Sequence, residues 1–301
     1  RVLKPGDRFS VLSWNLQFAG SREEAFFYDG GEAVSVPEDR VRRTMSSIAE
    51  VVREYSPDVL FLQEVDRDSA RTGRIDQLQA YIDAVDWACW SSTPYHRSRY
   101  VPHPSSQHLG RIDLHLAVLS KLALGSGERI ALPGLSEGWL RRQFNLKRAV
   151  QSLSLAVEGR SPIRIGNTHL SAFSRGDGTL GHQVGVLQGW IGEGGPWVLA
   201  GDMNMLPPGD DPARLEGSES SYSDATNPVL GLQPARFDVD RADLLSPSAR
   251  TYLPFGASEP DRKIDYLLAS EDLELVEHRV LREASQLSDH LPIWAVFEVR
   301  P

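Results

Sequence analysis

Cysteine is almost absent from this chain: Cys89 is the only one among 301 residues. A lone cysteine excludes an intrachain disulfide and any metal site built from several thiolates. The sequence also lacks an apolar run long enough to span a bilayer, and it has no signal-peptide pattern. We therefore expect a soluble domain, either cytoplasmic or exported with a leader upstream of Arg1.

Positive charge is scarce as well. The 32 Lys and Arg residues are outnumbered by 41 Asp and Glu, which gives a net charge of −9 and a pI near 5.4. Broad binding of a polyanion such as duplex nucleic acid requires a basic surface, so this balance argues against it but leaves room for a local basic patch. Carboxylates gathered around a cation would explain part of the acidity.

The sequence does contain short apolar segments that alternate with amphipathic ones. Strands are predicted over residues 9–14, 59–62, 114–120, 149–157, 163–168, 264–269, 275–280 and 293–299. Helices are predicted after Pro37, around residues 78–85 and over residues 180–191. Residues 93–113 are rich in proline, histidine and arginine and are expected to form a long loop. No internal repeat and no linker is evident, so residues 1–301 are expected to form one domain.

The clearest functional signal is WVLAGDMN, residues 197–204. A buried strand leads to Gly201, where the backbone can turn sharply, and then to Asp202 and Asn204. On an extended segment, side chains two residues apart point to the same side. A general base or metal ligand would thus lie beside an amide able to hold a water or a phosphoryl oxygen. Gly-Asp is also an ordinary way to end a strand, so the signal depends on similar strand ends elsewhere.

Several other apolar segments carry polar side chains suited to phosphoryl chemistry. They are Asn15, Glu64 and His169 at strand ends, Asp289 and His290 ahead of the last strand, and Asp265 within a strand. Taken singly, each has an ordinary structural interpretation, such as a turn cap or a hydrogen-bonded core histidine. Repeated polar ends on buried strands would be costly unless the groups meet. Convergence on a cation and a phosphate accounts for all of them.

Six motifs, in this order, resemble the endonuclease/exonuclease/phosphatase superfamily: SWNL, FLQEV, NTHL, AGDMN, KIDYLL and LSDHLPI. Each is short, but they are spread along the sequence so that the resemblance covers nearly the whole chain. The resemblance implies an α/β fold, a four-layer αββα sandwich in which two central, mostly antiparallel sheets are flanked by helices. It further implies an enzyme, a metal-dependent phosphoric ester hydrolase that uses Mg²⁺, for which Mn²⁺ could substitute.

The same resemblance implies the metal ligands. Glu64 matches the principal Mg²⁺ ligand, with Asn15 and Asp289 close to the ion. This agrees with the preference of Mg²⁺ for hard oxygen ligands and for keeping several waters, because one or two carboxylates then suffice. Some members carry an aspartate two residues after the first asparagine; here that position is Gln17, which puts a second tight metal site in doubt.

The resemblance also assigns the remaining catalytic positions. Asp202 would orient or deprotonate the attacking water, and Asn204 would hold that water or a phosphoryl oxygen. His290 would contact the phosphoryl group, with its tautomer set by Asp265. His169 would stabilise the transition state or assist the leaving group.

Substrate recognition is expected from the loops. Arg97 and Arg99 lie where cations and aromatics are interleaved, as phosphate or base recognition would require, although a solvated loop has the same composition. Arg175 lies in a Gly-rich turn that follows the NTHL motif. His115 either touches the substrate or packs at the start of its strand. The acidic segment MLPPGDDP, residues 205–212, would repel a long polyanion.

We therefore expect a phosphodiesterase or phosphatase that acts as a monomer on a small or lipid-like phosphoester rather than on nucleic acid. The alternative is a metal-dependent endonuclease or exonuclease of DNA or RNA. A non-catalytic binding module on the same fold is a third hypothesis. Such a module would be free to lose its carboxylates, and every inferred core position is kept here.

Overall fold

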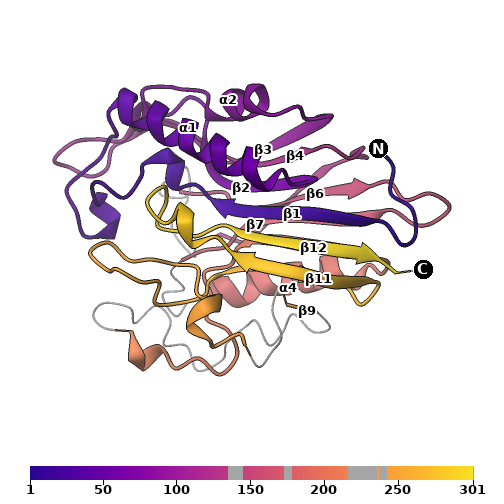
Figure 1. Ribbon diagram of the computed structural model, residues 1–301. Helices are drawn as coiled ribbons and strands as arrows, with labels where there is room; N and C mark the ends of the chain where they lie inside the picture. Colours follow the sequence, from indigo (N-terminus) through magenta and orange to yellow (C-terminus); the bar gives the residue numbers. More distant parts are fainter. Residues whose placement is uncertain (135–144, 173–177, 216–235, 238–242, 301) are drawn as a thin grey trace.

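Two six-stranded sheets form the framework of the protein (Figure 1). The computed structural model describes residues 1–134, 145–172, 178–215, 236–237 and 243–300. The first sheet consists, in spatial order, of β11 (Leu273–Val280), β12 (Ile293–Val299), β1 (Arg8–Asn15), β2 (Val59–Asp66), β4 (Gly110–Ser120) and β3 (Cys89–Val101). The second consists of β5 (Glu128–Ala131), β6 (Ala149–Leu155), β7 (Ile163–His169), β8 (Trp197–Asp202), β10 (Asp265–Ala269) and β9 (Arg236–Phe237).

Each sheet has one parallel pair of strands at its centre. These pairs are β1 with β2 and β7 with β8, and the other neighbours are antiparallel. A helix makes each crossover: α1 (Glu38–Tyr55) joins β1 to β2, and α4 (Thr179–Gly192) joins β7 to β8. Parallel strands end at the same edge of their sheet. Asn15 at the end of β1 donates to Asp202 at the end of β8, so both pairs end at one edge of the sandwich. The chain ends lie at the opposite edge (Figure 1).

Apolar side chains fill the space between four layers. Helix α1 buries a stripe with helical spacing (Val41, Met45, Ile48 and Val52) against the outer face of the first sheet, beside α2 (Gln77–Ala84). Between the sheets, Val11 and Phe61 belong to the same cluster as Ile165 and Val198. Helix α4 covers the outer face of the second sheet with Leu187 and Trp190, among others. The predicted four-layer sandwich with mostly antiparallel sheets is confirmed.

The predicted loop over residues 93–113 is wrong. Residues 89–101 form β3, which pairs with β4 as an antiparallel hairpin. Because β3 lies at the edge of its sheet, it tolerates Pro94 and exposed polar residues that a central strand would exclude. Only Thr93, Tyr95 and Val101 are buried along it. Strand β5 is also an edge strand and was not predicted, because most of its side chains are exposed.

No helix in the described parts of the chain is both long and apolar enough to cross a lipid bilayer.

Candidate active site

The end of β8 has a backbone conformation that requires glycine. Gly201 has a φ of +142°, and a Cβ there would lie 1.9 Å from the carbonyl oxygen of Thr168 on β7. This close approach accompanies a register in which Asp202 pairs with His169 on β7 and with Asp265 on β10. Strand pairing therefore places two carboxylates and a histidine side by side at one edge of the second sheet.

An irregularity in β2 directs two adjacent side chains, Gln63 and Glu64, to different partners. The pairing of β2 with β4 shifts register around Glu64, whose φ is +57°. A positive φ is uncommon in residues other than glycine, and such strain is concentrated at functional sites. Gln63 crosses between the sheets and donates from Nε2 to Asn167 Oδ1 at 2.8 Å. Glu64 Oε1 instead lies 3.4 Å from Asn15 Nδ2 and 3.8 Å from His169 Nδ1.

Asn15 joins the two sheets at the centre of the site. Its Nδ2 donates to Asp202 Oδ2 at 3.0 Å, and its Oδ1 accepts from the backbone of Gln17 at 3.1 Å. Asn204 supports the same carboxylate from the other side, because its backbone N–H donates to Asp202 Oδ1 at 2.9 Å. The side-chain amide of Asn204 is held by the carbonyl oxygen of Leu170 at 3.1 Å. These contacts fix the orientation of Asp202.

His290 is held by Asp265. Its Nδ1 lies 2.9 and 3.1 Å from the two carboxylate oxygens, and its Nε2 lies 3.7 Å from Asp202 Oδ2. Thr251 Oγ1 accepts from the backbone N–H of Asp265 at 3.1 Å and so fixes that strand end. Burial alone would lower the pKa of His290, but the carboxylates of Asp265, Asp202 and Asp289 outweigh it and hold that pKa well above its usual value. These carboxylates therefore favour the imidazolium form of the ring, which carries an N–H on Nε2.

The surroundings of His169 shift its pKa in the opposite direction. Burial, reinforced by the nearby charges of Arg148 and His290, holds the pKa of His169 well below its usual value. Its Nε2 lies 3.3 Å from Asp202 Oδ2, and its Nδ1 lies 3.2 Å from the hydroxyl of Tyr95. A neutral ring with its proton on Nε2 satisfies both contacts, since it donates to the carboxylate and accepts from the phenol.

Asp202 lies between these two rings and titrates near neutrality. Burial raises the pKa of Asp202 from 3.8 to about 7. His290 and the hydrogen bonds from Asn204 and Asn15 act in the other direction, while Asp265 adds to the rise. A carboxylate with a pKa close to the working pH can accept a proton efficiently.

The sequence of the chain matches a known protein family over most of its length. The family model described as "Endonuclease/Exonuclease/phosphatase family" matches residues 12–290. The chain belongs to this family. The family has the fold of metal-dependent phosphoesterases, and its members are generally hydrolases of phosphoester bonds. No curated protein sequence gives a significant match.

Solved structures share the fold. An endonuclease/exonuclease/phosphatase from Beutenbergia cavernae DSM 12333 is 23% identical, with a TM-score of 0.69 over 97% of this chain and 72% of that one. Truncated TDP2 from Caenorhabditis elegans is 20% identical, with a TM-score of 0.56 over 97% of each chain. The human Nocturnin catalytic domain with bound sulfate is 19% identical, with a TM-score of 0.59 over 97% of this chain and 93% of that one. These identities show the fold alone.

Two groups of side chains at the site could hold the metal ion of a metal-dependent phosphoesterase. Ligand atoms of Asp202, Asp265 and His290 lie within 4.8 Å of one another. The second group contains the carboxylates of Glu64 and Asp289, which repel each other. Burial first, and then Asp289, raises the pKa of Glu64, although Arg71 opposes the rise. Burial also raises the pKa of Asp289.

Asp29 adds a third carboxylate to the second group and was not predicted from the sequence. Burial, followed by the charges of Asp289 and Glu64, raises the pKa of Asp29 to about 8. Its Oδ2 is buried without a hydrogen-bond partner among the described residues. A buried carboxylate oxygen without a partner, on a residue that feels the charges of Asp289 and Glu64, fits a cation, because a cation would supply the missing positive charge.

The predicted substrate-binding residues do not join this cluster through any contact in the described structure. Arg97 is paired with Asp113 at 3.2 Å, and its side chain is 66% exposed. Arg99 is exposed on β3. His115 is buried, with Nε2 3.0 Å from Asp113 Oδ1. Arg175 lies outside the described residues.

Arg148 is a residue of the site that the sequence analysis missed. It is only 9% exposed and immediately precedes β6, and its guanidinium carbon lies 5.5 Å from the ring centroid of Tyr95. Glu64 and Asp202 are close enough for their charges to act on it. Its only signal in the sequence is an arginine directly before a buried strand, which is too common to single out.

Proposed function

We propose that this protein is a Mg²⁺-dependent hydrolase of phosphoester bonds, a phosphodiesterase or a phosphatase. The observation that carries the proposal is the position of Asp202, whose pKa is about 7, between a neutral His169 and a charged His290. Neighbouring groups whose pKa values are pushed apart mark an acid–base site. The family fold supports the same reaction class.

The metal is assigned to the oxygen-rich side of the site. Glu64 would be the principal ligand, with Asp289, Asn15 and Asp29 close to the ion. Mg²⁺ prefers carboxylate and amide oxygens, whereas Nδ1 of His290 is already occupied by Asp265. When bound there, the cation would neutralise charge on the phosphoryl oxygens.

The protein groups then divide the remaining work. Asp202 would accept a proton from the attacking water, and Asn15 and Asn204 hold this carboxylate in position. His290 would donate from Nε2 to a phosphoryl oxygen, with its charge supported by Asp265. His169 would stabilise the transition state from the other side of Asp202.

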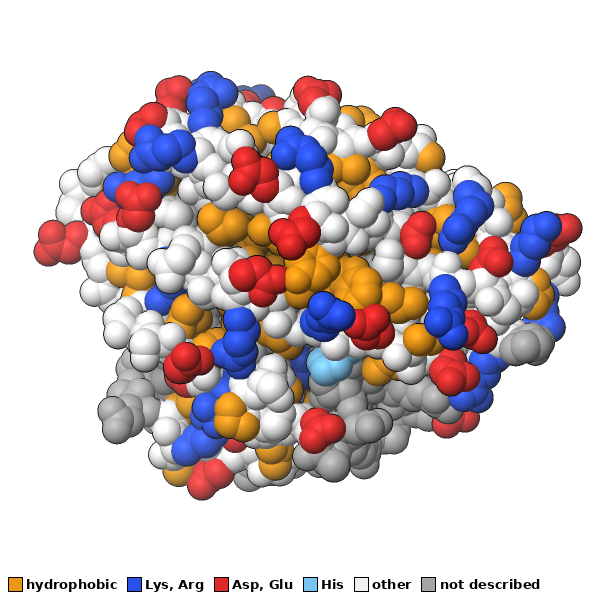
Figure 2. Space-filling view, viewed as in Figure 1, with side chains coloured by type: hydrophobic (Ala, Val, Ile, Leu, Met, Phe, Trp, Pro, Cys, Tyr) orange, Lys and Arg blue, Asp and Glu red, His pale blue; other side chains and the backbone are white. Residues whose placement is uncertain are grey.

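A small or lipid-like phosphoester is the favoured substrate. The net charge of −9 disfavours a polyanion, and Figure 2 shows basic and acidic side chains interspersed over one face rather than gathered into a basic area. The same proposal takes the chain as a single domain that acts as a monomer. A metal-dependent nuclease is the second candidate, and the observation in its favour is the exposure of Arg97 and Arg99 on β3.

A substrate panel with Mg²⁺ tests this choice. It would compare bis-p-nitrophenyl phosphate, inositol phosphates and sphingomyelin with plasmid DNA and abasic DNA, each over a series of monovalent salt concentrations. We expect the largest kcat/KM on a small or lipid ester, with a weak dependence on salt. A larger kcat/KM on DNA with a steep negative salt slope would establish the nuclease instead, because binding of several phosphates releases counterions. Binding without any hydrolysis would indicate the non-catalytic module.

A further inference from the structure

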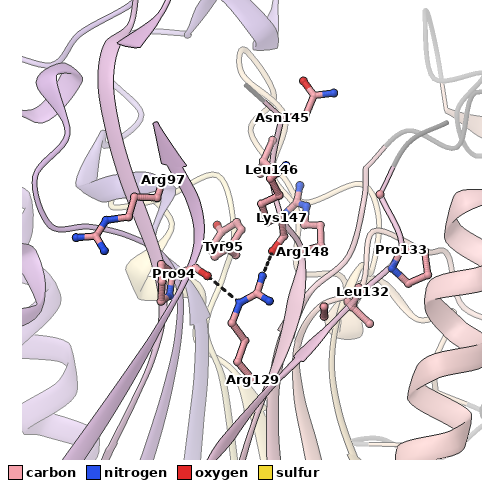
Figure 3. Close-up of a pocket in the computed structure, with 12 residues that line it drawn as sticks. Pro94, Tyr95, Arg97, Arg129, Leu132, Pro133, Asn145, Leu146, Lys147 and Arg148 are labelled. Atoms are coloured by element: carbon pink, nitrogen blue, oxygen red, sulfur yellow. Dashed lines mark hydrogen bonds between the residues drawn. The ribbon is translucent and has the colours of Figure 1, made fainter. Parts of the chain in front are cut away.

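A basic pocket lies beside the catalytic edge (Figure 3). Its volume is about 640 Å³, within the range of about 300–1,000 Å³ that small-molecule sites occupy. Among the described lining residues the charged ones are all cations, namely Arg97, Arg129, Lys147 and Arg148. Figure 3 shows the guanidinium of Arg97 directed away from that of Arg129. Arg129, Lys147 and Arg148 therefore give the pocket a positive lining in a protein that is acidic as a whole.

Arg129 connects two walls of this pocket through backbone hydrogen bonds. Its Nε donates to the carbonyl oxygen of Pro94 at 3.2 Å, and its Nη2 donates to the carbonyl oxygen of Lys147 at 2.6 Å. These two bonds, drawn as dashed lines in Figure 3, tie β3 to the segment before β6. Arg129 thus holds two walls of the pocket together, and part of its hydrogen-bonding capacity is already used.

Arg148 is in a different situation. Only 9% of its surface is exposed to solvent, and its Nη1 has no hydrogen-bond partner among the described residues. Burial lowers the pKa of Arg148 by more than Tyr95, Glu64 and Asp202 raise it. A buried charge without a partner is costly and is kept where a ligand supplies the partner. Guanidinium is well suited to phosphate because its donors match two oxygens at once.

A single side chain, Tyr95, lies between the pocket and the reacting groups. Tyr95, which lines it, has its ring 5.5 Å from the guanidinium carbon of Arg148, and its hydroxyl lies 3.2 Å from His169 Nδ1. His169 in turn contacts Asp202 at 3.3 Å. A group held in the pocket would be separated from the catalytic histidine by one tyrosine side chain. Leu132 and Pro133 add apolar walls that would strengthen an ion pair by excluding water.

We propose that this pocket binds a second phosphate group of the substrate, with Arg148 as its principal ligand. The preferred substrate would then be a phosphoester that carries a further phosphate beyond the scissile bond. The inference rests on the proposed function, because it takes the site beside Tyr95 to be the centre of phosphoester hydrolysis.

The test uses alkanediol bisphosphates with two to six carbons and alkyl monophosphates of the same lengths. Phosphate release with Mg²⁺ gives kcat/KM for each pair. Two equivalent phosphates alone give a ratio of about two, whereas a charge-assisted contact should raise the ratio at the fitting length to about tenfold to a hundredfold. Arg148→Gln should lower kcat/KM at least about tenfold more for the bisphosphate than for the monophosphate. Arg160→Gln, at a distant surface turn, is the matched control and should change neither.

Several outcomes would overturn the proposal. A ratio of about two at every length, with the monophosphates hydrolysed, would refute the pocket and leave the proposed function intact. An equal loss on both substrates in Arg148→Gln would place Arg148 at the scissile phosphate instead. A gain reproduced by adding inorganic phosphate to the monophosphate would mean that the pocket takes a free anion. If Arg148→Gln does not fold, Arg148→Lys keeps the charge but loses the two-oxygen contact, and an unchanged ratio in it would also count against the proposal.

A binding measurement separates this inference from the activity. Calorimetry with butane-1,4-diol bisphosphate and metal-free protein should show Arg148→Gln binding about tenfold more weakly than the wild type. This holds even if no phosphoester is hydrolysed, a result that would refute the proposed function alone. Equal affinities would refute the pocket.

Discussion

Replacing Asp202 with asparagine should stabilise the protein while removing its activity. In the wild type, burial raises the pKa of Asp202 from 3.8 to about 7. The native state therefore keeps a proton that the unfolded chain loses, so the free energy of unfolding falls as pH rises from about 4 to about 7. A difference of about three pKa units corresponds to a cost of about 4 kcal/mol at pH 8.

Asparagine removes the cost of burying an ionised carboxylate, but it also loses favourable contacts of Asp202. It gives up the attraction to His290, and its NH₂ group would face a donor, Nδ2 of Asn15. We therefore expect Asp202→Asn to be more stable than the wild type by about 1–2 kcal/mol at pH 8. Between pH 8 and pH 5 the difference should fall by about 2–3 kcal/mol, because the native carboxylate becomes protonated. Its kcat should fall about 10²–10⁴-fold, as expected for loss of a general base.

Urea denaturation in EDTA at pH 8 and pH 5, followed by tryptophan fluorescence, measures this effect. Glu158→Gln replaces an exposed carboxylate that has only a surface ion pair with Lys4, and it serves as the control. A variant that is less stable than the wild type at pH 8, with a difference that does not change with pH, would refute the reasoning. The burial of an ionised Asp202 would then not be a cost to the fold.

Three further substitutions test other parts of the site. Asp265→Asn should lower kcat with little change in metal affinity, because His290 loses the carboxylate that orients its ring and supports its positive charge; the double variant with His290→Ala should be hardly worse than His290→Ala, and additive losses would show independent roles. Arg71→Met should cost about 3–5 kcal/mol in urea denaturation, since it leaves the fully buried Asp66 without its ion pair, and a loss below 1 kcal/mol would contradict this. Gly201→Ala should unfold more readily and lose activity, because its Cβ would meet backbone at 1.9 Å; a stable, active variant would show that β8 can shift.

The core of the site was predictable because it depends on strand ends. A buried strand shows its periodicity locally, and in a sheet with parallel pairs its C-terminal end has a defined place. The motifs around Asn15, Glu64, His169 and Asp202 therefore indicated both the elements and the edge at which they meet. The contacts among these side chains agree with that expectation.

The periphery of the site was not predictable for a physical reason. Asp29 ends a short 3-10 helix, Phe27–Asp29, and Arg148 lies in an irregular segment before β6. Each reaches the site only through long-range packing that leaves no local pattern. Strand β3 was missed because an edge strand needs little apolar periodicity. Pro94 within it suggested a loop, although an edge strand can lose a hydrogen-bond donor at little cost.

The central claim is that hydrolysis takes place at Glu64 and Asp202 with a divalent cation. The most direct measurement is the rate of bis-p-nitrophenyl phosphate hydrolysis over a Mg²⁺ titration for the wild type, Glu64→Gln and the Glu158→Gln control. We predict that EDTA abolishes the wild-type rate and that Mg²⁺ or Mn²⁺ restores it. Glu64→Gln should need at least about tenfold more Mg²⁺ while remaining folded, as loss of a principal ligand requires. Full activity of Glu64→Gln at low Mg²⁺, or a wild-type rate that EDTA leaves unchanged, would contradict the account.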